Sequence, residues 1–224
     1  DKTQLTAIYG ENEKSYKRFL SLSQNFERIY SHKEAEFFTA PGRTEIIGNH
    51  TDHNGGLVIA GSIDMDTIGA AFPNNSDVIR ITSEGYAAEI VVDLSKSLNP
   101  KDLSGTQALV AGMAEGFKKY GFAISGFDAY VSTTVIPAAG VSSSASFEML
   151  CWTIANYFFN DEKITLSDYA KIGKYAENVY WNKSSGVMDQ LACAVGGTVL
   201  FDFSNAKMPK YEKLPFSFED YGYT

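Results

Sequence analysis

A serine-rich run at residues 137–146, Pro-Ala-Ala-Gly-Val-Ser-Ser-Ser-Ala-Ser, most constrains how this chain can fold. It follows an alternating segment, residues 126–136, that predicts a strand, and it precedes an apolar segment, about 143–159, that predicts a helix. Small residues let the backbone approach a ligand closely, and the amides and dipole at a helix start favour an anion. The run therefore predicts a phosphate-binding turn, and the alternative is a serine-rich helix cap preceded by a loop.

The remaining periodicity places most strands before most helices. We expect strands at 57–72, 77–92 and 198–203, the second interrupted by a turn at Glu84-Gly85 and antiparallel to the first. We expect further helices at 13–30, at 106–120, from the capping box at Thr165 to about Trp181, and from about residue 188. Because strands and helices do not alternate regularly, an α+β fold is favoured, with a mixed or antiparallel sheet packed against helices.

Composition excludes several classes of protein. The 224 residues suffice for one large domain or one and a half. With 19 Lys+Arg against 27 Asp+Glu, no basic stripe is available for nucleic acid, and no apolar run is long enough for a membrane helix. Cys151 and Cys193 both lie in apolar contexts, which indicates reduced core thiols in a cytoplasmic protein. Nothing in the sequence sets the oligomeric state, although a monomer is compatible with it.

A second polar segment, residues 40–56, places Arg43, Asn49, His50 and Asp52 among glycines. Carboxylate and amide groups at this density suit a ligand with many hydroxyls, and an arginine can stabilise developing negative charge. A metal site built from His50, Asp52 and His53 is one alternative, although the remaining histidine, His32, is expected on a surface helix. A purely structural polar loop is the other alternative.

A third segment, residues 176–190, carries Glu177 and Asp189. Asp189 follows a glycine-bearing loop near the start of a short helix, where a carboxylate can act on a ligand or simply complement the helix dipole. Glu177, on a helix, is by itself typical of a solvated face.

Together the three segments resemble the GHMP kinase superfamily and, within it, the galactokinase family. Residues 42–56 resemble the family's sugar signature, roughly Gly-Arg-Val-Asn-x-Ile-Gly-Glu-His-Thr-Asp-Tyr-Asn-x-Gly. Residues 137–145 are similar to its nucleotide loop, Pro-x-x-x-Gly-Leu-Ser-Ser-Ser-Ala, and residues 186–190 match its Gly-[Ile/Leu]-Met-Asp-Gln segment. The motifs occur in the family's order, and the resemblance covers nearly the whole chain.

The resemblance implies ATP-dependent phosphorylation of the anomeric hydroxyl of galactose, with ATP and Mg²⁺ as cofactors. Asp189 would act as general base or orient that hydroxyl, and Arg43 would stabilise charge in transfer. The implied sugar-binding residues are Arg43, Asn49, His50, Asp52, Gly186 and Asp189. The implied nucleotide-binding residues are Gly140, Val141, Ser142, Ser143, Ser144 and Ala145, and the implied metal ligands are Ser144 and Glu177.

Two departures from the signature leave the sugar open, because Asn49 stands where the family usually has Glu and His53 where it has Tyr. A GHMP kinase for an amino sugar, a uronic acid or a pentose is therefore one alternative, and a non-catalytic sugar sensor is another. The resemblance also implies an N-terminal sugar- and ATP-binding domain over residues 1–204. Residues 205–224 would begin a truncated second α+β domain, which lacks the family's later glycine-rich motif.

Overall fold

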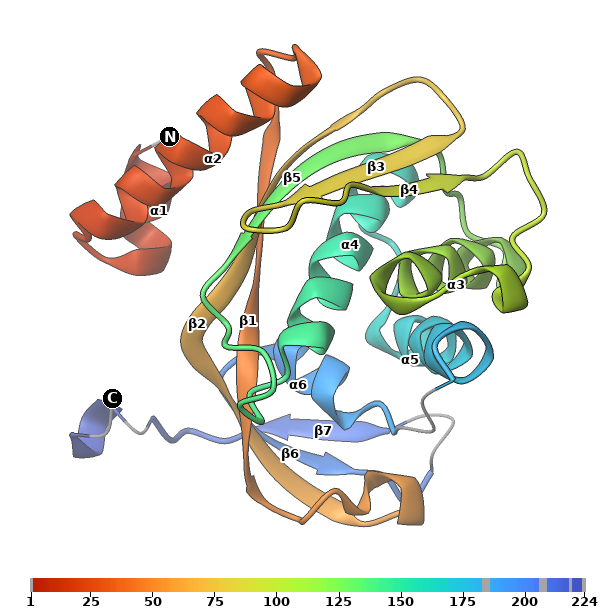
Figure 1. Cartoon of the computed structure of the whole chain (residues 1–224). Coiled ribbons are helices and arrows are strands. Elements are labelled where there is room, and N and C mark those ends of the chain that lie inside the picture. Colours follow the sequence, from red (N-terminus) through yellow and green to blue (C-terminus); the bar gives the residue numbers. More distant parts are fainter. Residues whose placement is uncertain (1, 183–185, 206–208, 218, 223–224) are drawn as a thin grey trace.

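One mixed sheet with helices on both faces forms the molecule (Figure 1). The computed structural model describes residues 2–182, 186–205, 209–217 and 219–222. The helices are α1 (Lys2–Tyr9), α2 (Glu13–Tyr30), α3 (Gly105–Lys119), α4 (Ser143–Asn160), α5 (Leu166–Tyr175) and α6 (Met188–Val195). The strands are β1 (Glu36–Ile47), β2 (Leu57–Pro73), β3 (Val78–Ser83), β4 (Ile90–Asp93), β5 (Phe127–Thr133), β6 (Thr198–Asp202) and β7 (Lys210–Lys213). The expected α+β class is confirmed.

The long strand β2 organises the sheet, whose order is β4-β3-β5-β2-β6-β7 with β1 paired to β2. The first residues of β2 pair with β6, its last residues pair with β5, and β1 runs antiparallel along both parts. β2 and β3 run in opposite directions, as expected, but they are not neighbours, because β5 lies between them and pairs antiparallel with β2 and parallel with β3. The chain thus returns much later in the sequence to fill the position between the two strands.

The two faces of β2 are covered by different helices, as Figure 1 shows. Ile68 and Ala70 pack against α2, whereas Ala71 belongs to the larger core beneath α3 and α4. The alternation follows from the two-residue period of a strand. Gly69 lets α4 approach closely, since an added Cβ there would lie 3.1 Å from Leu150.

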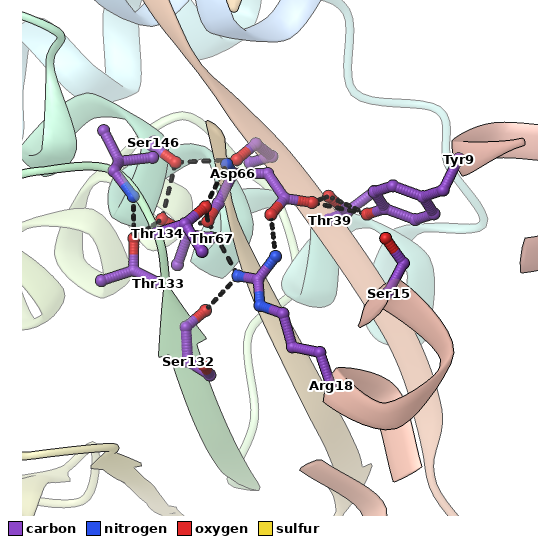
Figure 2. A network of polar contacts seen from close by, with 12 residues as sticks. Tyr9, Ser15, Arg18, Thr39, Asp66, Thr67, Ser132, Thr133, Thr134 and Ser146 are labelled. Carbon is purple, nitrogen blue, oxygen red and sulfur yellow. Dashed lines mark hydrogen bonds and ion pairs between the residues drawn. The ribbon is translucent and has the colours of Figure 1, made fainter. Parts of the chain in front are cut away.

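A polar network fastens the N-terminal helices to the sheet (Figure 2). Arg18 of α2 forms an ion pair with Asp66 of β2 and donates to the Ser132 carbonyl oxygen at 3.2 Å. Tyr9 donates its hydroxyl to the same Asp66 carboxylate. Because the Asp66 side chain is almost fully buried, these partners offset its desolvation and fix α1 and α2 on the face opposite α4.

Strand β1 was missed by sequence reasoning because Pro41-Gly42 is typical of a loop. The strand accommodates the pair through a shift in register between Pro41 and Arg43. His32 is not on a surface helix, since it follows the left-handed residue Ser31 that ends α2.

Two further expectations concern the C-terminal part. Helix α5 gives way to a π-helical turn, η3 (Ala176–Tyr180), and residues 183–185 of the expected loop at 182–187 lie outside the described residues. Strand β7 follows the predicted domain boundary at residue 204 and pairs with β6, and that boundary stays a prediction. Within the described ranges, no helix combines the length and the apolar character that crossing a bilayer requires.

Candidate active site

An ion pair between Arg43 of β1 and Asp189 of α6 lies at the centre of the candidate site. Arg43 is buried and donates from Nε and Nη2 to Oδ1 of Asp189, at 3.0 and 2.7 Å. Its third nitrogen, Nη1, donates to the carbonyl oxygen of Gly140 at 2.8 Å. One guanidinium therefore links the sugar-signature strand, the serine-rich loop and the helix that carries Asp189.

The second carboxylate oxygen of Asp189 accepts from the Ser142 hydroxyl at 2.9 Å. Ser142 precedes α4 in a left-handed conformation, with φ 58°, and its side chain makes no cap hydrogen bond to that helix. This geometry contradicts the simple capping explanation for Ser142. It also shows that Asp189 does more than complement the dipole of α6, since both its oxygens have side-chain partners.

Gln190, which sequence reasoning did not single out, connects the first turn of α6 to helix α4. Gln190 is buried and donates Nε2 to Oε2 of buried Glu148 on α4, at 3.1 Å. A polar residue directly after Asp189 in an apolar helix is the signal that could have found it. The contact fixes the helix turn from which Asp189 projects.

A cavity of about 650 Å³ opens beside the start of α4. Its lining includes Ser143 and Ser144 of the serine-rich segment, together with Tyr86, Phe147 and Trp181. Ala145, the last residue of the predicted nucleotide loop, is instead buried in the core. The cavity has the size of a small-molecule site, and its aromatic wall was not expected from the sequence.

Asp52 and Gly186 meet at the start of α6, next to Asp189. Asp52 lies in a 3₁₀ turn, η1 (Thr51–Asn54), is only 6% exposed and accepts from the Met188 amide at 3.2 Å. A Cβ added to Gly186 would lie 1.6 Å from Oδ2 of Asp52, so only glycine fits here. The Asp52 carboxylate therefore lies close against the backbone at Gly186, whereas the contact of Gly186 with a sugar stays a prediction.

Asn49 and His50 form the outer part of this region, and both adopt left-handed backbone conformations. Asn49 is exposed. The His50 imidazole lies 3.2 Å from Oε2 of Glu45, and the His50 amide donates to Oε1 of the same carboxylate at 2.8 Å. Glu45 was missed by sequence reasoning, although it lies two residues after Arg43 on the same strand.

The metal-ligand predictions have separate outcomes. Ser144 lines the cavity, and Glu177 lies in the π-helical turn at only 2% exposure, so the expectation of a solvated face residue is wrong. π-Helical turns occur frequently at functional sites. The alternative metal site is not supported, since His50 pairs with Glu45 rather than joining Asp52 and His53. Among the described residues, no three His, Cys, Asp or Glu side chains form a group that could hold a metal ion.

The thiols of Cys193 and Cys151 have raised pKa values. Burial raises the pKa of Cys193 to about 12, and the Asp189 carboxylate raises it further in a smaller measure. Burial likewise raises the pKa of Cys151 far above its ordinary value. Both thiols are free, as expected, and belong to the core.

Comparison with known proteins agrees with this geometry. Residues 24–73 match the galactokinase galactose-binding signature, and residues 108–197 match the N-terminal domain of GHMP kinases. Galactokinase from Lactococcus lactis subsp. lactis is 31% identical over 90% of this chain and 51% of its own length. Galactokinase from Streptococcus mutans is 32% identical over 89% of this chain and 51% of its own length.

Solved structures of galactokinase and of mevalonate kinase are similar to this fold. The crystal structure of Lactococcus lactis galactokinase complexed with galactose has a TM-score of 0.78 at 29% identity, over 89% of this chain and 52% of that one. Methanococcus jannaschii mevalonate kinase has a TM-score of 0.64 at 19% identity, over 84% of this chain and 58% of that one, and shares the fold. The chain spans about half the length of the curated relatives that it matches. Because residues 24–73 match the galactokinase signature and the chain is 31% identical to a galactokinase over 90% of its length, it belongs to the galactokinase family of the GHMP kinase superfamily.

Proposed function

We propose that the full-length protein phosphorylates the anomeric hydroxyl of galactose with ATP. The observation that supports this most is the junction of Arg43, Asp189 and Ser142, where the sugar signature meets the serine-rich loop. Phosphoryl transfer depends on positioning and charge neutralisation more than on covalent help from the protein. The junction supplies both at one point.

On the sugar side, Asp189 accepts from or orients the hydroxyl that attacks. A carboxylate fixed through both oxygens is held in one orientation, which a positioned proton acceptor requires. Arg43 stabilises negative charge as it develops beside Asp189. Asp52 and the backbone at Gly186 bind the sugar, because the two contact each other at the start of α6, where Asp52 accepts from the Met188 amide next to Asp189.

On the nucleotide side, the cavity beside α4 receives ATP. Ser143 and Ser144 lie in the first turn of that helix, where backbone amides and the helix dipole favour phosphate oxygens. Phe147 and Trp181 offer apolar surface for a flat base. The cavity volume lies within the range of small-molecule sites.

The donor set fits Mg²⁺, a hard cation that prefers oxygen ligands and commonly shares them with substrate phosphates. Ser144 and Glu177 would hold the ion, one through a hydroxyl at the cavity and the other through a carboxylate withdrawn from solvent. The ion would neutralise phosphate charge when bound. We place the reaction in the cytoplasm, since both cysteines are free thiols.

A coupled assay of ADP release by the full-length protein tests the proposal. Galactose, galactosamine, galacturonic acid and a pentose are compared at matched ATP and Mg²⁺. We expect galactose to give the highest specificity constant. Turnover that favours another sugar would instead support the alternative kinase, and sugar binding without turnover would support the sensor.

A further inference from the structure

The Glu45 carboxylate faces the candidate site although no role has been assigned to it. Arg43 and Glu45 are two residues apart on a regular part of β1, between its two register shifts. Side chains two residues apart share a face of a strand, with Cα atoms about 7 Å from each other. Glu45 is also the cross-strand partner of Ala60, which packs in a buried cluster with Met188. Glu45 thus lies on the face that carries Asp189.

His50 holds this carboxylate in place. The His50 amide donates to Oε1 at 2.8 Å, and the His50 imidazole lies 3.2 Å from Oε2. The left-handed conformations of Asn49 and His50 turn the backbone so that both contacts reach one side chain. The Glu45 side chain remains 14% exposed. Each carboxylate oxygen has two lone pairs, so each retains one acceptor position for a hydroxyl.

Among the described residues, carboxylates outnumber fixed cations around the sugar side. Glu45, Asp52 and Asp189 contribute three carboxylates, and Arg43 forms an ion pair with one of them, Asp189. An additional carboxylate on a ligand would lie within a few ångströms of these like charges. Repulsion between them is strong, because the three side chains are largely buried and water weakens the interaction little. A neutral ligand avoids this repulsion.

We propose that Glu45 is a sugar-binding residue that sets the substrate class. It accepts a hydroxyl of a neutral hexose, His50 fixes its orientation, and its charge excludes sugar acids while tolerating amino sugars. The family signature has Asn at this position and Glu at the position of Asn49, so the chain carries the two residues in exchanged order. This inference rests on the proposed function.

Kinetic analysis of the full-length protein tests the role of Glu45. Glu45→Gln keeps the shape and removes the charge, and we expect KM for galactose to rise roughly fivefold with kcat little changed. We expect the specificity constant for galacturonic acid relative to galactose to rise roughly tenfold. Glu36→Gln is the matched control, because Glu36 is an exposed residue at the other end of β1.

Two more variants distinguish a specific role of Glu45 from an effect of misfolding. Glu45→Asp retains the charge, so discrimination against galacturonic acid persists while KM for galactose rises. The double variant Glu45→Asn with Asn49→Glu restores the family's order and brings KM for galactose back towards the wild-type value. Binding of a fluorescent ATP analogue reports folding in each case.

The outcomes separate the two proposals. Wild-type turnover with unchanged KM and unchanged sugar-acid discrimination in Glu45→Gln overturns the role of Glu45 alone. Absence of turnover by the wild-type protein with every sugar overturns the proposed kinase function and the inference with it. A wild-type protein that prefers galacturonic acid also overturns the inference, while leaving a sugar kinase in place.

Discussion

Arg43 and Asp189 are 146 residues apart in the chain, yet two hydrogen bonds join the guanidinium of one to a single carboxylate oxygen of the other. The pair brings strand β1 and helix α6 together at the edge of the serine-rich loop, whose Gly140 carbonyl oxygen accepts the remaining arginine contact. Because the Arg43 side chain is only 5% exposed, the charge of each partner stabilises the other in a partly desolvated setting. The Asp189 side chain is still 26% exposed, so a ligand can reach the carboxylate.

Asp189→Asn tests whether this carboxylate takes part in the chemical step. The amide keeps the shape and removes the charged acceptor, so we expect turnover to fall on the order of 10²-fold or more. ATP affinity should change little, since the cavity lies beside α4. Near-normal turnover in the purified full-length variant would remove Asp189 from the mechanism.

Ser142→Ala tests the contact that aligns Asp189. The variant frees Oδ2 of Asp189 and leaves the ion pair with Arg43 intact. We expect kcat to fall roughly tenfold, as for the loss of one hydrogen bond to a charged group, with KM for the sugar changed less. Ser97→Ala, at an exposed position far from the loop in sequence, is the control. Equal rates for the two variants would show that Ser142 has no part in positioning.

Gly186→Ala tests the close approach beside Asp52. The new Cβ would lie 1.6 Å from Oδ2 of Asp52, so the loop or the carboxylate must move. We expect sugar affinity to fall at least tenfold and stability to fall by about 1–3 kcal/mol, as for an overpacked site. Gly61→Ala is a matched control, because an added Cβ there meets its neighbours at 3.6 Å or more. Thermal unfolding and sugar titration distinguish the two effects.

Sequence reasoning recovered the elements with strong local signals. The periodicity predicted α2 and α3 nearly to the residue, and Thr165 caps α5 as expected. It failed where the determinants are tertiary. Strand β1 contains Pro41-Gly42, which is stabilised as a strand only by pairing with β2, and the insertion of β5 beside β3 depends on chain topology.

The candidate site shows the same division. Motif order brought Arg43, Asp189 and the serine-rich loop into one hypothesis, and the structure does place them in contact. The burial of Glu177 could not be predicted, because an isolated carboxylate on a helix gives no sign of what covers it. The Ser142 contact was also hidden, since serine before a helix is usually a cap.

The pH dependence of Cys193 can be predicted from its burial. Its pKa is raised to about 12, so the thiolate is scarce at pH 8 and we expect slow reaction with a thiol reagent in the folded protein. Above the ordinary thiol pKa of about 8.5, the unfolded chain loses the proton while the folded chain keeps it. The unfolded state then binds fewer protons, and the free energy of unfolding falls by about 1.4 kcal/mol per pH unit for this thiol until about pH 12.

Cys193→Ala isolates this contribution. Its loss of stability between pH 9 and 10 should be shallower than that of the wild-type protein, by roughly 1 kcal/mol. Denaturant titrations at the two pH values give the comparison. Rapid labelling of Cys193 at pH 8 under native conditions would contradict the burial of the thiol.

Asn49→Glu addresses the position at which the chain departs most clearly from its family. A charged acceptor exceeds a neutral one by about 1 kcal/mol, so galactose affinity can rise at most about fivefold. Asn tolerates the left-handed backbone found here, with φ 51°, whereas Glu adopts it at a cost of roughly 1 kcal/mol. We therefore expect galactose to remain the best substrate, with a modest gain in affinity and a measurable loss of stability.

Asn49→Gly separates these two effects, because glycine accepts the same backbone conformation without a side chain. If Asn49 contacts the sugar, the glycine variant weakens galactose binding while unfolding at about the wild-type temperature. If Glu45 faces the substrate and position 49 does not, both substitutions at position 49 leave KM for galactose nearly unchanged, the change Asn49→Glu fails to rescue Glu45→Asn, and only Glu45→Gln raises KM. Specificity constants for galactose and its deoxy and amino analogues in the three variants decide which of the two residues faces the substrate.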